Sequence, residues 1–364
     1  MIIGVDAGAL CVSDERLKVG VYRVIVNLLK ELGSVDTKNT YILYSFDPID
    51  RGVMEQFGPS MENRVIWPVK GWFTVRLPLE LHMRPPDVFL GVSQALPRSP
   101  SKTIGFIYDA GFIHHPKAYP KSLVKLKKQT ETLVKRADHI LTISKTVQTD
   151  IQKLYGIAKD NISVAYPGID SRFTPRGDKI HQARPYFLFV GALKPGKNIP
   201  ALIRAFATFL TQTKKPYDLL LVGGDYWMDR EIKKTIQMFG LEHQVKILGY
   251  MSDVELPQYY RGAVALVSPS LYEGFCIPLV EAMACGCPVI GSTAGAMPEI
   301  ICDAGLTVDP NDDKDIAHAM RLIASNKHIR ASYVKKGIIR SRIFSWSTFG
   351  KTVLSVINEI ARNP

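Results

Sequence analysis

The chain has few cysteines and no long apolar run. Its 364 residues include five cysteines, an odd number that lacks the spacing of a disulfide framework. We therefore expect a reduced, cytoplasmic protein. No apolar stretch approaches the roughly 18 residues of a membrane-spanning helix. The opening MIIGVDAGAL lacks the basic start and long apolar core of a signal peptide, and it is typical of a first strand.

Features of metal and nucleic-acid chemistry are also scarce. No His/Cys cluster has ligand spacing, and no Asp-x-Asp lies in the loops expected to face a ligand. The pair Cys285-x-Cys287 flanks a predicted helix end, where packing is the better interpretation. The basic segment 121–136 has no interleaved aromatic residues, which disfavours nucleic acid. We expect neither a metal nor a cofactor.

Positive charge is plentiful, with a net charge of +12. This charge favours an anionic partner without naming it, because phosphates, nucleic acid and lipid headgroups all qualify. In KSLVKLKKQTETLVKR (121–136), six basic residues accompany one acidic residue and a narrow apolar side. Two interpretations stay open for this segment: a helix lying on an anionic membrane surface, or a solvated basic face over an ordinary core.

Length and patterning predict two α/β domains. A chain of this length exceeds one ordinary core. In the C-terminal half, compact apolar runs alternate with helical patterns, as in a doubly wound parallel sheet. The strands expected there are 185–191, 217–224, 244–250, 263–268, 288–292 and 304–310. The N-terminal half alternates more loosely, with strands expected at 1–7, 40–46, 65–69, 86–91, 103–109, 137–144 and 162–170.

The domain boundaries follow from a polar, aperiodic stretch, SRFTPRGDKIHQARP. We predict an N-terminal domain at 1–170, a linker at 171–184 and a C-terminal domain at 185–345. A last helix at 346–364 is expected to pack back toward the N-terminal domain. Two such sheets are expected to face each other across a cleft at their carboxyl edges.

The stretch YEGFCIPLVEAMACGCPVI (272–290) carries the chemistry. It follows an expected strand, Pro278 suits a first helical turn, and Gly286 suits the position just after a helix. These signals predict a short helix from about Ile277 to Cys285. The N-terminus of such a helix attracts an anion such as a pyrophosphate, and the carboxylates of Glu273 and Glu281 can accept hydroxyl hydrogen bonds.

This stretch resembles the motif E-G-F-G-x-P-x-x-E-A-M-A-x-G-x-P-V-I of the family 4 retaining glycosyltransferases, which have the GT-B fold of two Rossmann-like domains. The resemblance implies that Glu273, with the amides of Gly274 and Phe275, holds the donor sugar and diphosphate. It implies that Glu281 binds the ribose hydroxyls. Cys276 replaces the usual glycine; its amide can still donate, and its side chain is expected to narrow the sugar pocket.

Another stretch, VGALKPGKNIP (190–200), resembles the family pattern V-G-x-L-x-P-x-K-N. The resemblance assigns Lys197 to the donor phosphates. Ala192 stands where the family often has an arginine, and Lys194 is the candidate to replace that arginine.

Weaker matches extend the resemblance toward both ends of the chain. Gly20 matches a glycine of the family's G-I-G-R-Y and is assigned to donor binding. Asp109 matches the family's His-Asp pair, whereas Tyr108 replaces its histidine. The backbone at Gly249 and Tyr250 is assigned to the nucleotide base.

The resemblance implies that the N-terminal domain, 1–170, binds the acceptor and that the C-terminal domain, 185–345, binds the nucleotide sugar. It thus implies a retaining, metal-independent hexosyltransferase with Glu273, Lys197 and Asp109 as its catalytic residues. The expected donor is GDP-mannose ahead of UDP- or dTDP-sugars. The expected acceptor is a glycan or lipid-linked sugar in polysaccharide or O-antigen assembly, at the cytoplasmic face of a membrane. Two alternatives stay open: a nucleotide-sugar epimerase or hydrolase of the same fold, and a non-catalytic glycan-binding protein.

Overall fold

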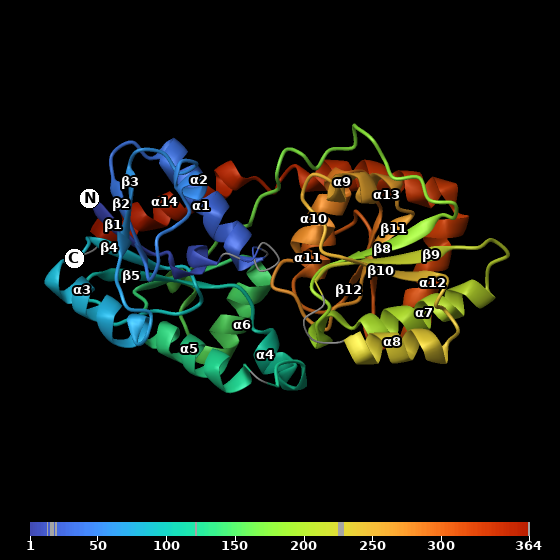
Figure 1. Cartoon of the computed structure of the whole chain (residues 1–364), viewed down its shortest axis with the longest axis horizontal. Coiled ribbons are helices and arrows are strands. Elements are labelled where there is room, and N and C mark those ends of the chain that lie inside the picture. Colours follow the sequence, from blue (N-terminus) through green and yellow to red (C-terminus); the bar gives the residue numbers. More distant parts are fainter. Residues whose placement is uncertain (13, 15–17, 19, 121, 225–228, 363–364) are drawn as a thin grey trace. The chain divides into compact units, whose positions relative to one another are not determined.

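The chain forms two compact units in the computed structural model, which describes residues 1–12, 14, 18, 20–120, 122–224 and 229–362 (Figure 1). The first unit comprises Met1–Ala110, Lys121–Gly168 and Ser345–Pro364. The second unit comprises Gly111–Pro120 and Ile169–Phe344. Each unit is an α/β domain with a parallel sheet, as the alternating pattern predicts.

The first unit contains a seven-stranded sheet of order β3-β2-β1-β4-β5-β6-β7. Its neighbouring strands all pair in parallel. The strands are β1 (Ile2–Asp6), β2 (Thr40–Ser45), β3 (Met61–Val65), β4 (Val88–Gly91), β5 (Lys102–Ile107), β6 (His139–Thr142) and β7 (Ile162–Val164). The helical elements are η1 (Gly8–Cys11), α1 (Val21–Val35), α2 (Arg51–Met54), η3 (Trp72–Arg76), α3 (Leu77–Met83), α5 (Leu123–Arg136), α6 (Lys145–Tyr155), η5 (Lys159–Asn161) and α14 (Trp346–Arg362).

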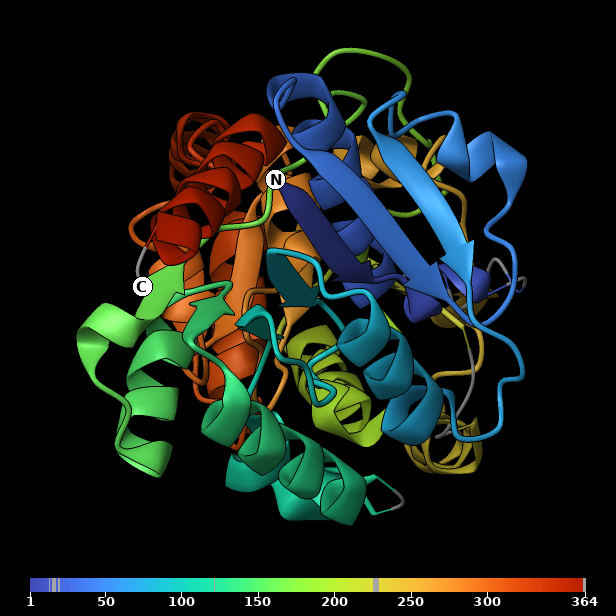
Figure 2. The ribbon, with the colours of Figure 1, turned by 90° about the vertical axis from the view of Figure 1, so that its left-hand side faces the viewer.

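Helices cover both faces of this sheet. Successive strand residues point to opposite faces, and β5 shows the division clearly. Phe106 packs against Phe349 of α14, with the two ring centroids 6.4 Å apart. Ile107 instead joins a hydrophobic cluster that contains buried residues of η3, α3, α5 and α6. These four elements therefore share one face of the sheet, whereas α14 packs on the other face together with α1 (Figure 2).

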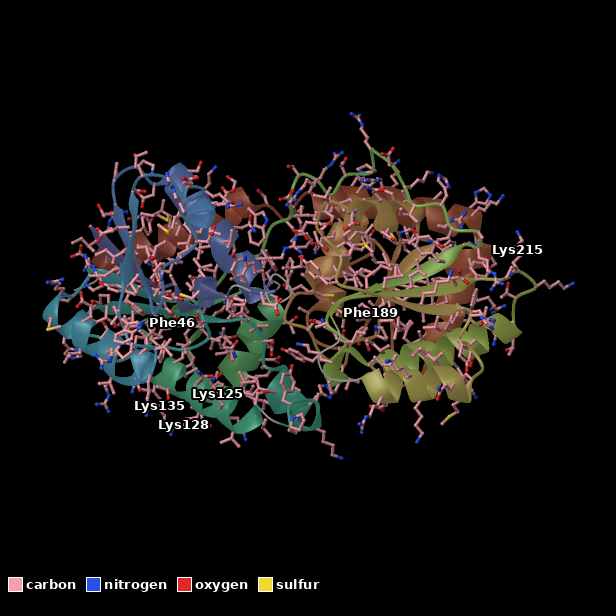
Figure 3. All side chains as sticks on the ribbon, viewed as in Figure 1. Phe46, Lys125, Lys128, Lys135, Phe189 and Lys215 are labelled. Carbon is pink, nitrogen blue, oxygen red and sulfur yellow. The ribbon has the colours of Figure 1, made fainter. Side chains whose placement is uncertain are left out.

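The second unit contains a six-stranded parallel sheet of order β10-β9-β8-β11-β12-β13. The strands are β8 (Tyr186–Val190), β9 (Asp218–Val222), β10 (Val245–Gly249), β11 (Ala265–Ser268), β12 (Val289–Ser292) and β13 (Leu306–Val308). The helical elements are α4 (Gly111–His114), η4 (Pro116–Ala118), η6 (Pro195–Lys197), α7 (Ile199–Thr211), α8 (Asp229–Met238), α9 (Leu256–Gly262), α10 (Ile277–Ala284), α11 (Met297–Ile301), α12 (Asp313–Ser325) and α13 (Lys327–Ser341). Phe189 lies in the core of this unit (Figure 3).

Each sheet has one point at which the strand order reverses. In the first unit this point lies between β1 and β4, and in the second unit it lies between β8 and β11. Loops that follow the two strands at such a point leave the same edge in opposite directions, and open α/β sheets bind ligands there. These two loop pairs are therefore the places to look for a site.

The predicted strand at 65–69 is wrong. The strand is β3, Met61–Val65, which pairs with β2 at the edge of the sheet. An edge strand with one covered side tolerates the polar sequence MENRV. The more apolar VIWPV was mistaken for a buried strand, although Trp67 is 78% exposed and Pro68 has no N–H to donate to a neighbouring strand.

The predicted linker at 171–184 belongs to the second unit. The guanidinium group of Arg261 donates hydrogen bonds to the carbonyls of Thr174 and Asp178, and the amide of Ile180 donates to the carbonyl of Gln258. These contacts hold the stretch along α9. The segment Gly111–Pro120 also belongs to the second unit, whereas α14 belongs to the first.

Candidate functional site

Lys197 and Glu273 meet at the point of strand reversal in the second unit. Lys197 ends η6, after β8, and Glu273 lies in the loop between β11 and α10. Because β8 and β11 are parallel neighbours, both loops leave the same edge of the sheet. The Lys197 ammonium donates to Glu273 Oε1 in an ion pair. The two side chains are only 13% and 16% exposed, so this pair is held in a largely desolvated position.

The charge of Glu273 is maintained by its neighbours. Burial alone would raise the pKa of this carboxyl group. The nearby ammonium groups of Lys197 and Lys194, together with hydrogen bonds from Lys197 and Ser270, outweigh burial and hold the pKa below its ordinary value. Glu273 is therefore an anion at neutral pH, able to accept hydrogen bonds from sugar hydroxyls.

The lowered pKa of Glu273 predicts a loss of stability in acid. A carboxyl group whose folded pKa lies below its unfolded value of about 4.3 stabilises the fold fully above that pH. This contribution is lost as the pH falls through the folded pKa. We expect the free energy of unfolding of the wild type to fall below about pH 4.3 more steeply than that of Glu273→Gln, as measured by urea unfolding. Parallel pH profiles for the two proteins would contradict this assignment.

Two residues with left-handed backbone conformations fix the loop that carries Glu273. Asn198 has a φ of 56°, and its side-chain amide donates to the carbonyls of Pro269 at 3.2 Å and Pro310 at 2.7 Å. Gly295 has a φ of 63°, and a Cβ there would lie 2.5 Å from the carbonyl oxygen of Glu273. That same oxygen accepts from the Ala296 amide at 2.8 Å. The close approach requires glycine and holds Glu273 in place.

Helix α10 follows the prediction closely. It spans Ile277–Ala284, and Gly286 adopts the left-handed φ of 72° expected just after a helix. Glu281 lies within this helix and is 1% exposed. Its Oε2 accepts from the Tyr260 hydroxyl of α9 at 2.9 Å, which fixes the direction of the carboxylate.

Cys276 precedes α10 in a conformation that usually belongs to glycine. Its φ and ψ are both 71°, in the left-handed region. Its thiol is buried, with Sγ 3.7 Å from Ser268 Oγ. Burial, reinforced by the negative charge of Glu273, raises the pKa of the Cys276 thiol to about 12. The thiol is therefore neutral at physiological pH, and it contributes bulk to this loop, not charge.

The other predicted donor-side residues lie on the same unit. Gly274 and Phe275 are buried in the loop before α10, and the Phe275 ring packs edge-on against Phe344 at 5.3 Å. Gly249 ends β10 with a φ of 74°, and the exposed Tyr250 follows it. Lys194 is exposed at the start of η6.

Three predicted residues belong to the first unit. Gly20 precedes α1 with a φ of 55°, and a Cβ there would meet nothing within 4 Å. Tyr108 is buried, and its hydroxyl donates to the Val92 carbonyl at 2.7 Å. Burial, reinforced by Asp6, raises the pKa of Tyr108 well above its usual range, so the phenol stays neutral. The half-buried Asp109 follows it, and its backbone carbonyl accepts from Gln94.

The sequence interpretation missed Asp6 at the point of strand reversal in the first unit. Asp6 ends β1 and is 1% exposed; its Oδ1 accepts from the Gly8 amide at 3.2 Å. Its Oδ2 has no hydrogen-bond partner in the part of the chain that the structure describes. Burial raises the pKa of this carboxyl group and outweighs the hydrogen bonds from Ser93 and Gly8, which lower it. The sequence signal for Asp6 was its position as an aspartate at the end of an otherwise apolar first strand, IIGVD.

The sequence interpretation also missed a stacked pair beside Glu273. The His114 ring of α4 stacks on Tyr272 at 5.1 Å with an interplanar angle of 17°. Tyr272 directly precedes Glu273, so this stack adjoins the ion pair in sequence. Burial and the charge of His114 lower the pKa of the neighbouring His115. They outweigh a hydrogen bond with the backbone of Leu271, which raises that pKa. Nothing in the local sequence indicated that segment 111–120 packs with the second unit.

Comparison with known families identifies the class of protein. Residues 170–340 match the family described as "Glycosyl transferases group 1", and residues 20–173 match "Glycosyltransferase Family 4". The chain is 30% identical over 270 residues to the O-antigen chain mannosyltransferase B of Escherichia coli, covering 71% of each chain. It is 36% identical over 221 residues to the O-antigen chain mannosyltransferase RfbU of Salmonella typhimurium, covering 60% of this chain and 58% of that protein.

Solved structures agree on the fold. Sucrose-phosphate synthase from Thermosynechococcus elongatus superposes with a TM-score of 0.78 at 19% identity, covering 99% of this chain and 98% of that one. WaaG, a glycosyltransferase involved in lipopolysaccharide biosynthesis, superposes with a TM-score of 0.75 at 16% identity, covering 98% and 99% of the two chains. The two Rossmann-like units are those of a GT-B glycosyltransferase. The chain belongs to glycosyltransferase family 4.

Proposed function

We propose that this glycosyltransferase transfers mannose from GDP-mannose, with retention of anomeric configuration, to a glycan or lipid-linked sugar in O-antigen-type assembly. The choice of mannose draws on the relatives, two of which are named O-antigen chain mannosyltransferases. The observation that carries a donor site is the desolvated Lys197–Glu273 pair beside the start of α10.

The proposed chemistry is electrostatic. The departing nucleoside diphosphate carries the charge that develops in the transition state, and a fixed ammonium group and helix N–H groups stabilise such charge. Lys197 supplies the cation, and the amides from Gly274 onward supply donors. Glu273 holds hydroxyls of the donor sugar, and Glu281 holds the ribose. In front-face transfer the leaving phosphate accepts the proton of the acceptor hydroxyl, so no side-chain base is required.

The acceptor side is assigned to the first unit. Asp6, the last residue of β1, and Asp109, two residues beyond the end of β5, supply the carboxyl groups there. We also propose that the protein works at the cytoplasmic face of a membrane, with the basic helix α5 toward anionic lipid. Among the described residues, no helix is long and apolar enough to cross a bilayer. Lys121, at the start of the predicted basic segment, lies outside the described residues.

A donor panel tests the function. The protein is incubated with GDP-mannose, UDP-glucose and a dTDP-sugar, each with and without EDTA, and release of nucleoside diphosphate is measured. We expect release or transfer with GDP-mannose above the other donors, unchanged by EDTA. A 2-epimer product would point to an epimerase, and inertness toward every donor would point to a glycan-binding protein. Loss of activity in EDTA would overturn metal independence.

A further inference from the structure

The outer side of η3 and α3 carries an exposed apolar stripe. Val75, Leu79 and Met83 recur every fourth residue and are 63%, 59% and 64% exposed. Residues four apart on a helix lie on one side. In the preceding loop, Trp67 and Val69 are also exposed. Large apolar side chains gathered on one side of a helix and exposed to water are uncommon on a monomer and mark an interaction surface.

The stripe is not the side of α3 that packs into the core, because a different side of this helix does so. Leu77 and Leu81 are fully buried and belong to the same hydrophobic cluster as Leu133 of α5. The core sides of α3 and α5 thus point to the same face of the sheet. Their outer sides consequently face away from the sheet on the same side of the first unit (Figure 2).

These outer sides are strongly basic. Lys125, Lys128 and Lys135 lie along the outer side of α5 (Figure 3). Residues 70–84 and 123–136 together contain eight Lys or Arg residues and two Glu residues. One of the two, Glu80, is largely buried and lies within 4 Å of guanidinium groups of Arg64 and Arg84. An apolar stripe and a basic helix therefore share one surface, and little negative charge offsets the positive charge of that helix.

We propose that this surface, which consists of Trp67, Val75, Leu79 and Met83 with the basic residues of α5, docks onto an anionic lipid bilayer. The pairing of the two chemistries selects the occupant. A polyanion such as nucleic acid would satisfy the lysines and leave the stripe in water. A bilayer offers anionic headgroups to the lysines and acyl chains to the stripe, at the depth reached by an amphipathic helix lying in the interface.

The proposal goes beyond a basic α5, because it makes α3 the inserting element. Attraction of lysines to anionic headgroups is screened by salt, whereas burial of apolar side chains is not. The two contributions can therefore be separated. The proposal is also independent of the transfer reaction, because no residue of this surface belongs to the donor site.

The test is co-sedimentation of the purified full chain with vesicles. One set contains equal parts phosphatidylcholine and phosphatidylglycerol, and the other contains phosphatidylcholine alone. We expect binding to the anionic set at least tenfold stronger than to the neutral set. Raising the salt from about 0.1 M to about 1 M shortens the Debye length from about 10 Å to about 3 Å and should weaken this preference.

Matched variants locate the contact. The triple variant Val75→Ser/Leu79→Ser/Met83→Ser should bind the anionic vesicles at least tenfold more weakly. The control Met238→Ser/Val254→Ser/Ile339→Ser, at equally exposed positions of the second unit, should bind like the wild type. The triple Lys125→Gln/Lys128→Gln/Lys135→Gln should reduce the salt dependence. Donor turnover in the absence of lipid should be unchanged in all of these variants, so failure here is distinct from failure of the proposed function.

Trp67 reports insertion directly. Trp227 lies outside the described residues, so the probe protein carries Trp227→Phe. The emission of Trp67 should shift to shorter wavelength on vesicle binding, and adding Trp67→Phe should abolish the shift, since Trp72 and Trp346 are buried already. The proposal is overturned if the wild type ignores anionic vesicles, or if the stripe variant binds as well as the control. It is equally overturned if the wild type forms a dimer that the stripe variant cannot form, because the stripe then contacts a second copy.

Discussion

Replacing Lys197 by alanine is expected to lower kcat for sugar transfer by about 100- to 1,000-fold, the range for removing one preorganised group that stabilises transition-state charge. The ammonium group lies in a largely desolvated loop at the strand reversal of the second unit. There it is not screened as a surface lysine is. The loss should appear in kcat more than in KM, because the charge on the diphosphate grows as the glycosidic bond breaks.

Two controls make this result specific. Lys215→Ala removes an exposed lysine between α7 and β9 in the same unit and should leave kcat unchanged (Figure 3). Lys194→Ala tests whether Lys194 replaces the arginine that the family often has; its exposure predicts a smaller loss than at Lys197. Lys197→Arg keeps the charge and should retain more activity than Lys197→Ala.

The alanine variant also leaves Glu273 without its main counter-charge. Removing one partner of a buried pair destabilises a protein by about 3–5 kcal/mol, and this pair is partly exposed, so a smaller loss is expected here. Lys197→Ala/Glu273→Gln removes both charges and should recover part of this stability without recovering kcat. Recovery of both together would show that Lys197 acts on folding alone.

Local signals account for the parts of the structure that the sequence predicted well. Helix α10 was placed because Pro278 and Gly286 specify its two ends through backbone chemistry that depends on no distant contact. Lys197 and Glu273 were found separately, each from its own motif. Their meeting follows from the pairing of β8 with β11, which is a property of the sheet and not of either motif.

Features set by tertiary packing were not predicted. Asp6 has no motif around it, and only the placement of β1 beside β4 brings it to the strand reversal. Segment 111–120 lies between two elements of the first unit in sequence and yet packs with the second. The apolar stripe of α3 was invisible because Leu77 and Leu79 look alike in sequence, although one is buried and the other exposed.

Replacing Glu281 by alanine is expected to weaken nucleoside diphosphate binding by about 10- to 100-fold. Hydrogen bonds to a charged group contribute about 1.5–3 kcal/mol, and each 1.4 kcal/mol is about tenfold in affinity. The carboxylate is buried within α10, and the Tyr260 hydroxyl fixes its direction. Tyr260→Phe keeps the carboxylate but loosens its direction, so it should weaken binding less than Glu281→Ala does.

Stability and affinity must be separated, because Glu281→Ala also removes the acceptor of the buried Tyr260 hydroxyl. A buried donor deprived of its acceptor costs about 1–3 kcal/mol. The double variant Glu281→Ala/Tyr260→Phe removes both polar groups, and it should recover stability in urea unfolding while nucleotide affinity stays low. Recovery of affinity along with stability would show that Glu281 supports the fold and does not contact the nucleotide.

The ribose assignment has its own probe, a nucleoside diphosphate that lacks the 2′ and 3′ hydroxyls. By calorimetry, the wild type should bind this analogue about 10- to 100-fold more weakly than the normal nucleotide, since the same hydrogen bonds are missing. Glu281→Ala should bind the two nucleotides nearly equally, because it has no carboxylate left to distinguish them. If Glu281→Ala still prefers the normal nucleotide by the wild-type factor, the ribose is held elsewhere, and the buried Glu281–Tyr260 pair is a structural element of α9 and α10.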